Sequence, residues 1–342
     1  MTKIAILDDY IGVALEYGDW SGLPGDPEIT VYREAIAPER LVGELAGYEV
    51  IVITQQRARF PRKVLEGLPN LRLLVCNGRT SNVIDHEARI ERGILLCGTT
   101  QTDRGATAGP AGYQVSRGLP APSEMAWGLI FAVAKRIGVE DRVIRAGGWQ
   151  TGFPVPLAGK TLGLLGAGRL GGAMVPVAKA LGMDVIAWSP NLTEERCAEL
   201  GVSWVTKDEL LSGADVLGVF LVLSERSRNT LRGDDLAKMK ASAILVNISR
   251  GPIVDEAALV EALRLGRLAG AGLDVFDREP LPADHPFRSL DNVVVTPHIG
   301  YVTEDGFRQA WRRMAEDVAA YLAGTPIRVV TDPADCPPMA PQ

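Results

Sequence analysis

The feature that most constrains this chain is a glycine motif that follows directly on a short apolar run. The run covers residues 162–165, and Gly166, Gly168 and Gly171 then form G-x-G-x-x-G ahead of a helix-competent segment. This pattern is typical of a β-strand that turns tightly into an α-helix whose N-terminus holds a phosphate. The chain contains 37 glycines, so a glycine-rich loop that binds nothing stays open until the context is considered.

The three glycines have different expected roles. Gly166 permits the tight turn, Gly168 lets a pyrophosphate approach the backbone, and Gly171 allows the helix to pack closely on the strand. Short apolar runs alternate with helix-like segments on both sides of the motif. This alternation predicts an α/β fold with parallel sheets, in which ligands bind where strands end. It brings forward residues 55–59 and 77–81 as ligand-facing loops.

The length of 342 residues predicts two domains. We expect residues 122–302 to form a Rossmann-type doubly wound domain that binds the cofactor. Residues 1–121 have fewer strands, which favours a smaller, flavodoxin-like α/β substrate domain. The helical pattern that begins at residue 303 should return to this smaller domain, so residues 303–342 complete it. The larger domain is then inserted in the smaller one, with a cleft between them.

Two segments near the domain boundary need separate interpretation. Ser123 is expected to cap one helix that continues to about Ala146, with an apolar and buried first half. Residues 99–122 have no periodicity, so they form either a functional loop or a tolerated surface insertion.

Composition excludes several classes of protein. The net charge of −6 gives no bulk attraction to nucleic acid or to an anionic membrane. No apolar run approaches about 18 residues, and the first residues are typical of a strand rather than of a signal peptide. The four cysteines are scattered without C-x-x-C, which favours reduced thiols in a cytoplasmic protein over a zinc site.

Chemically useful side chains follow several of the expected strands. His298, one of three histidines, lies just past the last strand, where it could exchange a proton with a substrate oxygen. Glu279 could orient this ring and stabilise its protonated form. Arg250 could bind a carboxylate through two hydrogen bonds. A structural loop histidine is the alternative for His298, but three such groups at strand ends of one sheet are rarely a coincidence.

The choice between NAD and NADP depends on the end of the strand at residues 184–188. An acidic residue there would bond the ribose 2′-hydroxyl of NAD. The chain has Ser189 instead, and Asp184 lies at the wrong end of the strand. Arg196 is the nearest arginine in the sequence. Discrimination is therefore expected to be weak, with both NAD and NADP as candidate cofactors.

Four motifs in order resemble the D-isomer-specific 2-hydroxyacid dehydrogenase family over nearly the whole chain. They occupy residues 157–171, 247–259, 272–280 and 296–300. The resemblance implies hydride transfer between NAD(P)H and a small 2-oxo acid, with glyoxylate or hydroxypyruvate as the substrate guess. It also implies a homodimer formed through the cofactor domain, to which the apolar half-helix after Ser123 is suited.

The resemblance also implies site residues. The catalytic group consists of Arg250, Glu279 and His298. Pyrophosphate contacts fall on Arg169 and Leu170, in addition to the three glycines, and Asp274 lies on the nicotinamide side. Asn77, Gly78 and Arg79 meet the substrate carboxylate from the smaller domain.

This chain departs from the family pattern at three places. Ser189 replaces the usual acid, Tyr301 replaces a small residue after His-Ile-Gly, and residues 101–120 are longer than usual, as in a lid or dimer arm. Two other functions stay open: a non-catalytic, dinucleotide-sensing regulator or corepressor on the same fold, and a Rossmann enzyme with another nucleotide cofactor, which the later motifs disfavour.

Overall fold

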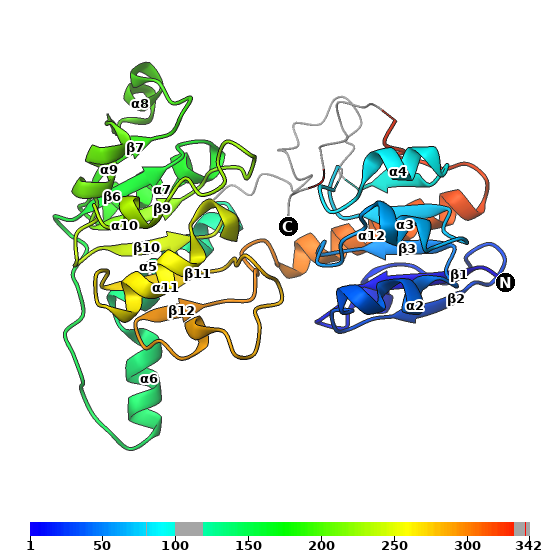
Figure 1. Cartoon of the computed structure of the whole chain (residues 1–342), viewed down its shortest axis with the longest axis horizontal. Coiled ribbons are helices and arrows are strands. Elements are labelled where there is room, and N and C mark those ends of the chain that lie inside the picture. Colours follow the sequence, from blue (N-terminus) through cyan, green and yellow to red (C-terminus); the bar gives the residue numbers. More distant parts are fainter. Residues whose placement is uncertain (80, 100–118, 332–338, 340–342) are drawn as a thin grey trace. The chain divides into compact units, whose positions relative to one another are not determined.

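The computed structural model describes residues 1–79, 81–99, 119–331 and 339. The chain divides into two compact units, one made of Met1–Ser116 with Thr303–Gln342 and the other of Arg117–Val302. The last helix, α12 (Glu304–Leu322), therefore belongs to the first unit. Each unit has its own sheet (Figure 1). Most of the expected lid or arm at 101–120 lies outside the described residues.

The first unit is built on a five-stranded parallel sheet. Its order is β2-β1-β3-β4-β5, the flavodoxin-like doubly wound order. The strands are β1 (Lys3–Leu7), β2 (Glu28–Val31), β3 (Val50–Ile53), β4 (Leu73–Cys76) and β5 (Leu95–Gly98). The helices are α1 (Ala14–Tyr17), the 3-10 helix η1 (Pro38–Arg40), α2 (Leu41–Leu45), α3 (Arg62–Glu66), α4 (His86–Glu91) and α12.

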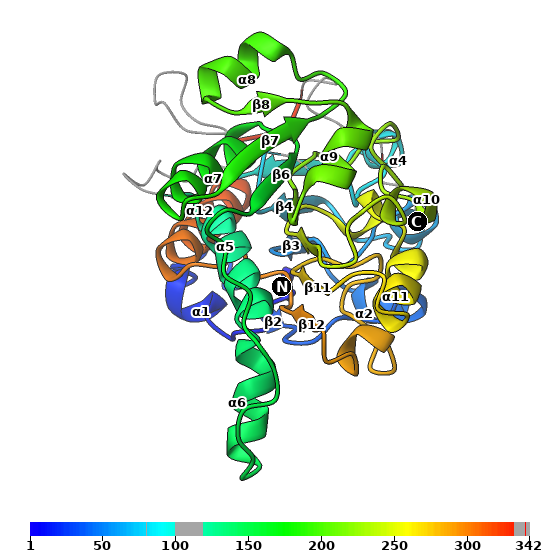
Figure 2. The ribbon, with the colours of Figure 1, turned by 90° about the vertical axis from the view of Figure 1, so that its left-hand side faces the viewer.

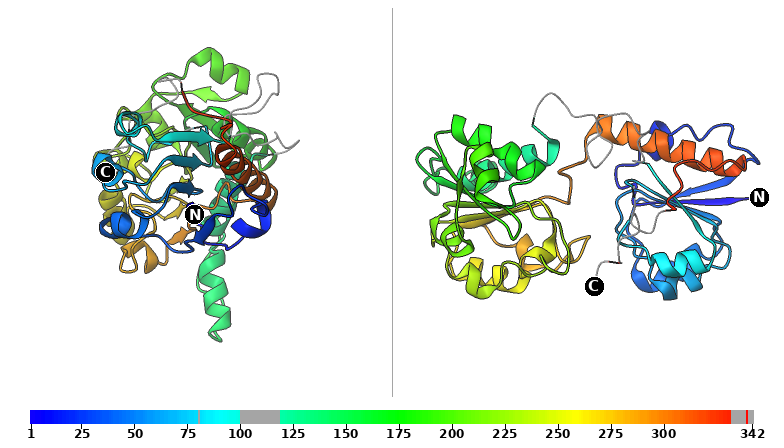
Figure 3. Two further views of the ribbon diagram at one scale, coloured as in Figure 1. Left: turned by 90° about the vertical axis from the view of Figure 1, so that its right-hand side faces the viewer. Right: turned by 90° about the horizontal axis from the view of Figure 1, so that it is seen from above.

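Helices cover both faces of this sheet. In Figure 3, α12 and α1 lie on one face, and α2, α3 and α4 lie on the other. The central strands β3 and β4 are buried along their whole length, as strands covered on both faces must be. Helix α12 presents one apolar stripe to the core, because Phe307, Trp311, Met314 and Val318 are all buried. Helix α12 packs on α1 and β4, so the last part of the chain covers elements from the first part.

The second unit is a Rossmann-type domain with a seven-stranded, all-parallel sheet. The strand order is β12-β11-β10-β9-β6-β7-β8. The strands are β6 (Thr161–Leu165), β7 (Asp184–Trp188), β8 (Ser203–Trp204), β9 (Val216–Val219), β10 (Ile244–Asn247), β11 (Gly270–Leu273) and β12 (Val293–Val295). The helices are α5 (Ala121–Ala134), α6 (Ile137–Arg145), α7 (Arg169–Ala180), α8 (Glu194–Leu200), α9 (Lys207–Gly213), α10 (Gly233–Leu236), α11 (Glu256–Arg264) and the 3-10 helices η2 (Gly251–Ile253) and η3 (Pro286–Arg288).

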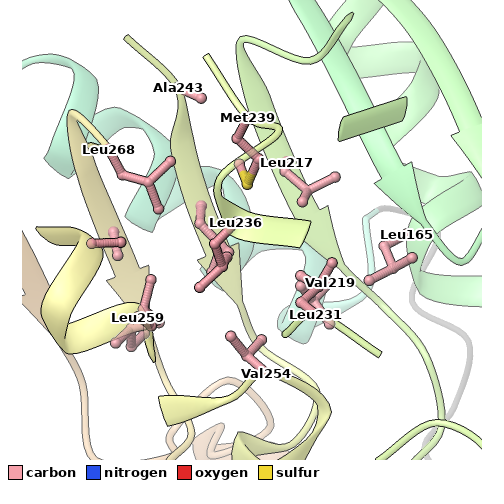
Figure 4. Packing of buried hydrophobic residues seen from close by; sticks show 14 of the residues in the cluster. Leu165, Leu217, Val219, Leu231, Leu236, Met239, Ala243, Val254, Leu259 and Leu268 are labelled. Carbon is pink, nitrogen blue, oxygen red and sulfur yellow. The ribbon is translucent and has the colours of Figure 1, made fainter. Parts of the chain in front are cut away.

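Two hydrophobic layers hold this sheet. On one face, side chains of α9, α10 and α11 pack on the central strands (Figure 4), with Leu236 and Leu259 among them. On the other face, α5 and α7 pack through Ile130 and Met174. The strand order reverses between β6 and β9, so the motif after β6 lies at the switch point where dinucleotides bind.

The expected single helix from Ser123 to Ala146 is wrong in two respects. The chain breaks after α5, where Arg136 adopts a left-handed conformation with φ 56°, and α6 then projects from its unit (Figure 2). Ser123 does not cap the helix, which begins at Ala121; its hydroxyl donates to the carbonyl of Leu170 at 3.1 Å. The buried residues of α5 pack within their own unit. Among the described residues, no helix has the length and apolar character needed to cross a membrane.

Candidate active site

The glycine motif forms the tight turn between β6 and α7. Gly166 has φ 100°, and a Cβ on Gly171 would lie 2.0 Å from the carbonyl oxygen of Gly166. A Cβ on Gly168 would meet no atom within 4 Å. Helix α7 begins at Arg169 without a side-chain cap, so no capping side chain satisfies its first N–H groups. The turn therefore fits the pyrophosphate of a dinucleotide.

His298 and Glu279 are brought together as the sequence predicts. His298 Nδ1 lies 2.7 Å from Glu279 Oε2, and only 8% of the histidine surface is exposed. Glu279 Oε1 accepts a hydrogen bond from the backbone N–H of Phe276 at 3.0 Å, which fixes the carboxylate. His298 itself has φ 55°, an uncommon conformation that requires support from neighbouring groups.

Asp274 provides that support. It follows β11 and is 1% exposed. Its carboxylate accepts hydrogen bonds from the Thr296 hydroxyl at 2.6 Å and from the backbone N–H groups of Ile299 at 2.9 Å and Gly300 at 2.8 Å. Burial raises the pKa of Asp274 above its usual value, although these donors act in the opposite direction. The carboxylate thus braces both sides of His298.

Arg250 lies at the end of the adjacent strand β10, with its side chain exposed. The buried side chain of Asn247 shapes the turn before it, since its Nδ2 donates to the Arg250 carbonyl at 2.9 Å and its Oδ1 accepts from Ser249 N–H at 3.0 Å. Strands β10, β11 and β12 are neighbours and parallel, so Arg250, Asp274 and His298 share one edge of the sheet. The ring of Tyr301 meets that of His298 edge-on, with centroids 5.6 Å apart.

The candidate substrate segment in the first unit follows β4. The N–H groups of Asn77 and Gly78 donate within the unit, to the Ile53 carbonyl at 3.2 Å and to Thr99 Oγ1 at 3.1 Å. Gln56 Nε2 donates to the Asn77 carbonyl at 3.1 Å. The Asn77 side chain is half-buried and that of Arg79 is exposed, whereas the N–H groups of Asn77 and Gly78 already have acceptors within the unit.

Sequence reasoning missed several supporting residues. Asn247, Thr296 and Gln56 bond to the segments that carry predicted site residues, and short polar side chains give no local signal of this role. The other two histidines have structural partners: His86 Nε2 lies 2.8 Å from the Ser81 carbonyl, and His285 Nε2 lies 3.1 Å from Glu256 Oε1. Among the residues that the structure describes, no cluster of metal-binding side chains occurs.

Comparison with known proteins identifies the family of the chain. Residues 127–300 match the family described as D-isomer specific 2-hydroxyacid dehydrogenase, NAD binding domain. A hydroxypyruvate reductase of Blautia hydrogenotrophica is 31% identical over 96% of this chain and 99% of its own length. A D-3-phosphoglycerate dehydrogenase of Archaeoglobus fulgidus is 33% identical over 95% of this chain, which spans 58% of that protein.

A solved structure extends the likeness to three dimensions. The phosphoglycerate oxidoreductase of Vibrio cholerae O395 superposes with a TM-score of 0.82 at 29% identity, covering 95% of this chain and 100% of that one. The chain therefore belongs to the D-isomer-specific 2-hydroxyacid dehydrogenase family and is an oxidoreductase of 2-oxo and 2-hydroxy acids that uses NAD or NADP.

Proposed function

We propose that the protein reduces a small 2-oxo acid to the D-2-hydroxy acid with His298, Glu279 and Arg250 as its catalytic group. The observation that carries this proposal is the 2.7 Å contact between His298 and Glu279 at the edge of the sheet that bears the dinucleotide turn. A bound nicotinamide would supply the hydride, and the chain must supply a proton and bind the substrate.

His298 is the proposed proton donor. Because Nδ1 bonds to Glu279, the proton for the substrate oxygen is held at Nε2. The Glu279 carboxylate keeps the ring in this orientation. The brace from Asp274 fixes the backbone that carries the ring, so the donor is positioned before substrate arrives.

Arg250 is the proposed partner of the substrate carboxylate. Its backbone is fixed by Asn247 while the guanidinium is exposed, which suits bidentate binding of a planar anion. We assign a second set of substrate contacts to the side chains of Asn77 and Arg79, since the Gly78 N–H already donates to Thr99 Oγ1. Cofactor contacts are assigned to Gly166, Gly168, Arg169, Leu170 and Gly171, to Ser189, and to Asp274 in addition to its bracing role. The unit Arg117–Val302 would then bind the cofactor and carry the catalytic group, and the other unit would contribute substrate contacts.

Glyoxylate and hydroxypyruvate are the proposed substrates. Support comes from similarity to the Blautia hydroxypyruvate reductase and to a glyoxylate reductase of Aeropyrum pernix, which is 36% identical over 76% of this chain. The test is oxidation of NADH and NADPH with a panel of 2-oxo acids that includes both. Turnover with either one supports the proposal. No oxidation with any acid would contradict it and favour a non-catalytic regulator.

We also propose a cytoplasmic homodimer. Three cysteines, Cys76, Cys97 and Cys197, are free and buried, which suits a reducing compartment.

The segment from α6 onward exposes large apolar side chains, with Trp149 74% and Phe153 95% exposed. Sedimentation of the double variant Trp149→Ser, Phe153→Ser should give a monomer where the wild type gives a dimer. A monomeric wild type would refute the dimer.

A further inference from the structure

The end of β7, where an acidic residue would select NAD, carries Ser189 instead of a carboxylate. Arg226, which is remote in the sequence, lies beside the turn that follows this strand. The backbone N–H of Leu192 donates to the Ser189 carbonyl at 3.1 Å, which closes a turn directly after β7. Pro190 occupies the first central position of this turn, where proline is favoured. The Trp204 indole donates to the Leu192 carbonyl at 3.1 Å and holds the turn in place.

Arg226 reaches this turn from the loop after β9. Its Nη2 lies 3.5 Å from Asn191 Oδ1, and both side chains are exposed. Residues 191 and 226 are 35 positions apart, so neither motif nor spacing reveals the contact. Arg196, the nearest arginine in the sequence, is instead paired with Glu199 at 2.6 Å on α8.

Internal hydrogen bonds order the loop that carries Arg226. The hydroxyl of Ser227, which is buried, donates to the Val222 carbonyl at 2.7 Å and accepts from the Ser224 N–H at 2.7 Å. The Arg228 N–H donates to the Ser224 carbonyl at 2.9 Å and closes a helical turn. These bonds fix the backbone at 226, so the guanidinium is presented from a defined position.

We propose that Arg226, with Ser189 and Asn191, forms a site for the 2′-phosphate of NADP, so that this chain prefers NADP(H) over NAD(H). The inference rests on the proposed dinucleotide-binding function. In a Rossmann domain the adenosine ribose lies at the end of the second strand, which here is β7. A carboxylate at this place accepts from the 2′-hydroxyl of NAD and repels a phosphate. Here Ser189, Asn191 and Arg226 supply a hydroxyl, an amide and a guanidinium instead, and each of these groups can donate a hydrogen bond to a phosphate oxygen.

The carboxylate of Glu195, four positions after Asn191, already has partners of its own. Glu195, in the first turn of α8, bonds to the Thr193 hydroxyl and to a backbone N–H, which lower its pKa below the usual value. Its carboxylate is thus engaged at the start of its own helix. The exposed guanidinium of Arg226 contacts an amide oxygen, which leaves its charge uncompensated by that contact.

The test measures binding rather than turnover. Dissociation constants of NADP⁺, NAD⁺, 2′,5′-ADP and 5′-AMP are obtained by titration calorimetry for the wild type and for Arg226→Gln. The wild type should bind each 2′-phosphorylated ligand more tightly than its unphosphorylated counterpart. Arg226→Gln should weaken the phosphorylated ligands about tenfold, the loss of one charge-assisted hydrogen bond, and leave NAD⁺ and 5′-AMP unchanged. Added salt should weaken NADP⁺ more than NAD⁺.

Two further variants sharpen the result. Arg196→Gln is the matched control, because it removes a guanidinium that is already paired, and it should change no dissociation constant by more than about twofold. Ser189→Asp restores a carboxylate and should reverse the preference toward NAD⁺. Equal wild-type affinities for NADP⁺ and NAD⁺, or equal losses of both in Arg226→Gln, would overturn the 2′-phosphate site while dinucleotide binding stands. Binding of none of the four ligands would overturn the proposed function and this inference with it.

Discussion

Substitution of Asp274 by Asn tests whether this carboxylate braces the histidine loop. Three donors meet the carboxylate: the Thr296 hydroxyl and the N–H groups of Ile299 and Gly300. Asparagine has one acceptor oxygen and an NH₂ group in its place. The hydroxyl can rotate to accept from that NH₂, but a fixed N–H cannot, so either orientation of the amide leaves one backbone N–H facing a donor.

The expected loss of stability follows from the one backbone N–H that is left without an acceptor. One buried, unsatisfied N–H costs about 1–3 kcal/mol. The substitution also removes a carboxylate whose charged form is disfavoured by burial, as the raised pKa of Asp274 indicates. This gain offsets part of that cost. We therefore expect Asp274→Asn to lower the unfolding free energy by about 1–2 kcal/mol and to reduce kcat, because the backbone of His298 loses part of its support.

The assay is urea unfolding of the protein without cofactor. Asp184→Asn, an exposed substitution on β7, serves as the control and should stay within about 0.5 kcal/mol of the wild type. The absence of cofactor separates the two roles assigned to Asp274, since a residue that only contacts the nicotinamide would leave this stability unchanged. A wild-type urea midpoint for Asp274→Asn would refute the bracing role.

Further predictions concern the glycine turn and a buried ion pair. Gly171→Ala places a Cβ 2.0 Å from the Gly166 carbonyl oxygen, so it should lower the unfolding free energy by about 1–3 kcal/mol, measured by thermal denaturation. The Cβ of Gly168→Ala meets no atom within 4 Å, so this variant should keep wild-type stability but bind the dinucleotide more weakly in calorimetry. Wild-type affinity in Gly168→Ala would contradict the placement of the pyrophosphate. Asp317 is 0% exposed and accepts from Arg328 Nε at 2.7 Å, yet burial raises its pKa from 3.8 to about 6. The folded state thus holds this proton more tightly than the unfolded state, so unfolding free energy should fall by about 2 kcal/mol between about pH 4 and pH 7. In urea unfolding, Asp317→Asn should not show this fall in unfolding free energy with pH. If the wild type and Asp317→Asn have the same pH profile, the fall does not come from Asp317.

The sequence predicts those parts of the fold that depend on local patterns. The glycine motif after β6 and the helical pattern of α12 are local, and both lie where expected. The break before α6 was missed because the left-handed Arg136 interrupts a segment that otherwise has good helical spacing.

Contacts between remote segments explain the remaining misses at the site. His298 and Glu279 are recognisable because each follows a strand with chemistry that suggests a role. The brace at Asp274 depends on N–H groups 25 and 26 residues away, and backbone groups leave no trace in a sequence. The proximity of Arg226 to Asn191 arises only when β7 and β9 are placed on either side of β6.

The central claim is that His298 donates the proton to the substrate oxygen. The most direct test is His298→Gln, with kcat measured on the 2-oxo acid that the wild type turns over fastest and dinucleotide affinity measured by calorimetry on the same protein. Loss of a positioned general acid should lower kcat by about 10²–10⁴-fold while the dissociation constant of the dinucleotide stays at its wild-type value. A kcat close to that of the wild type would contradict the account.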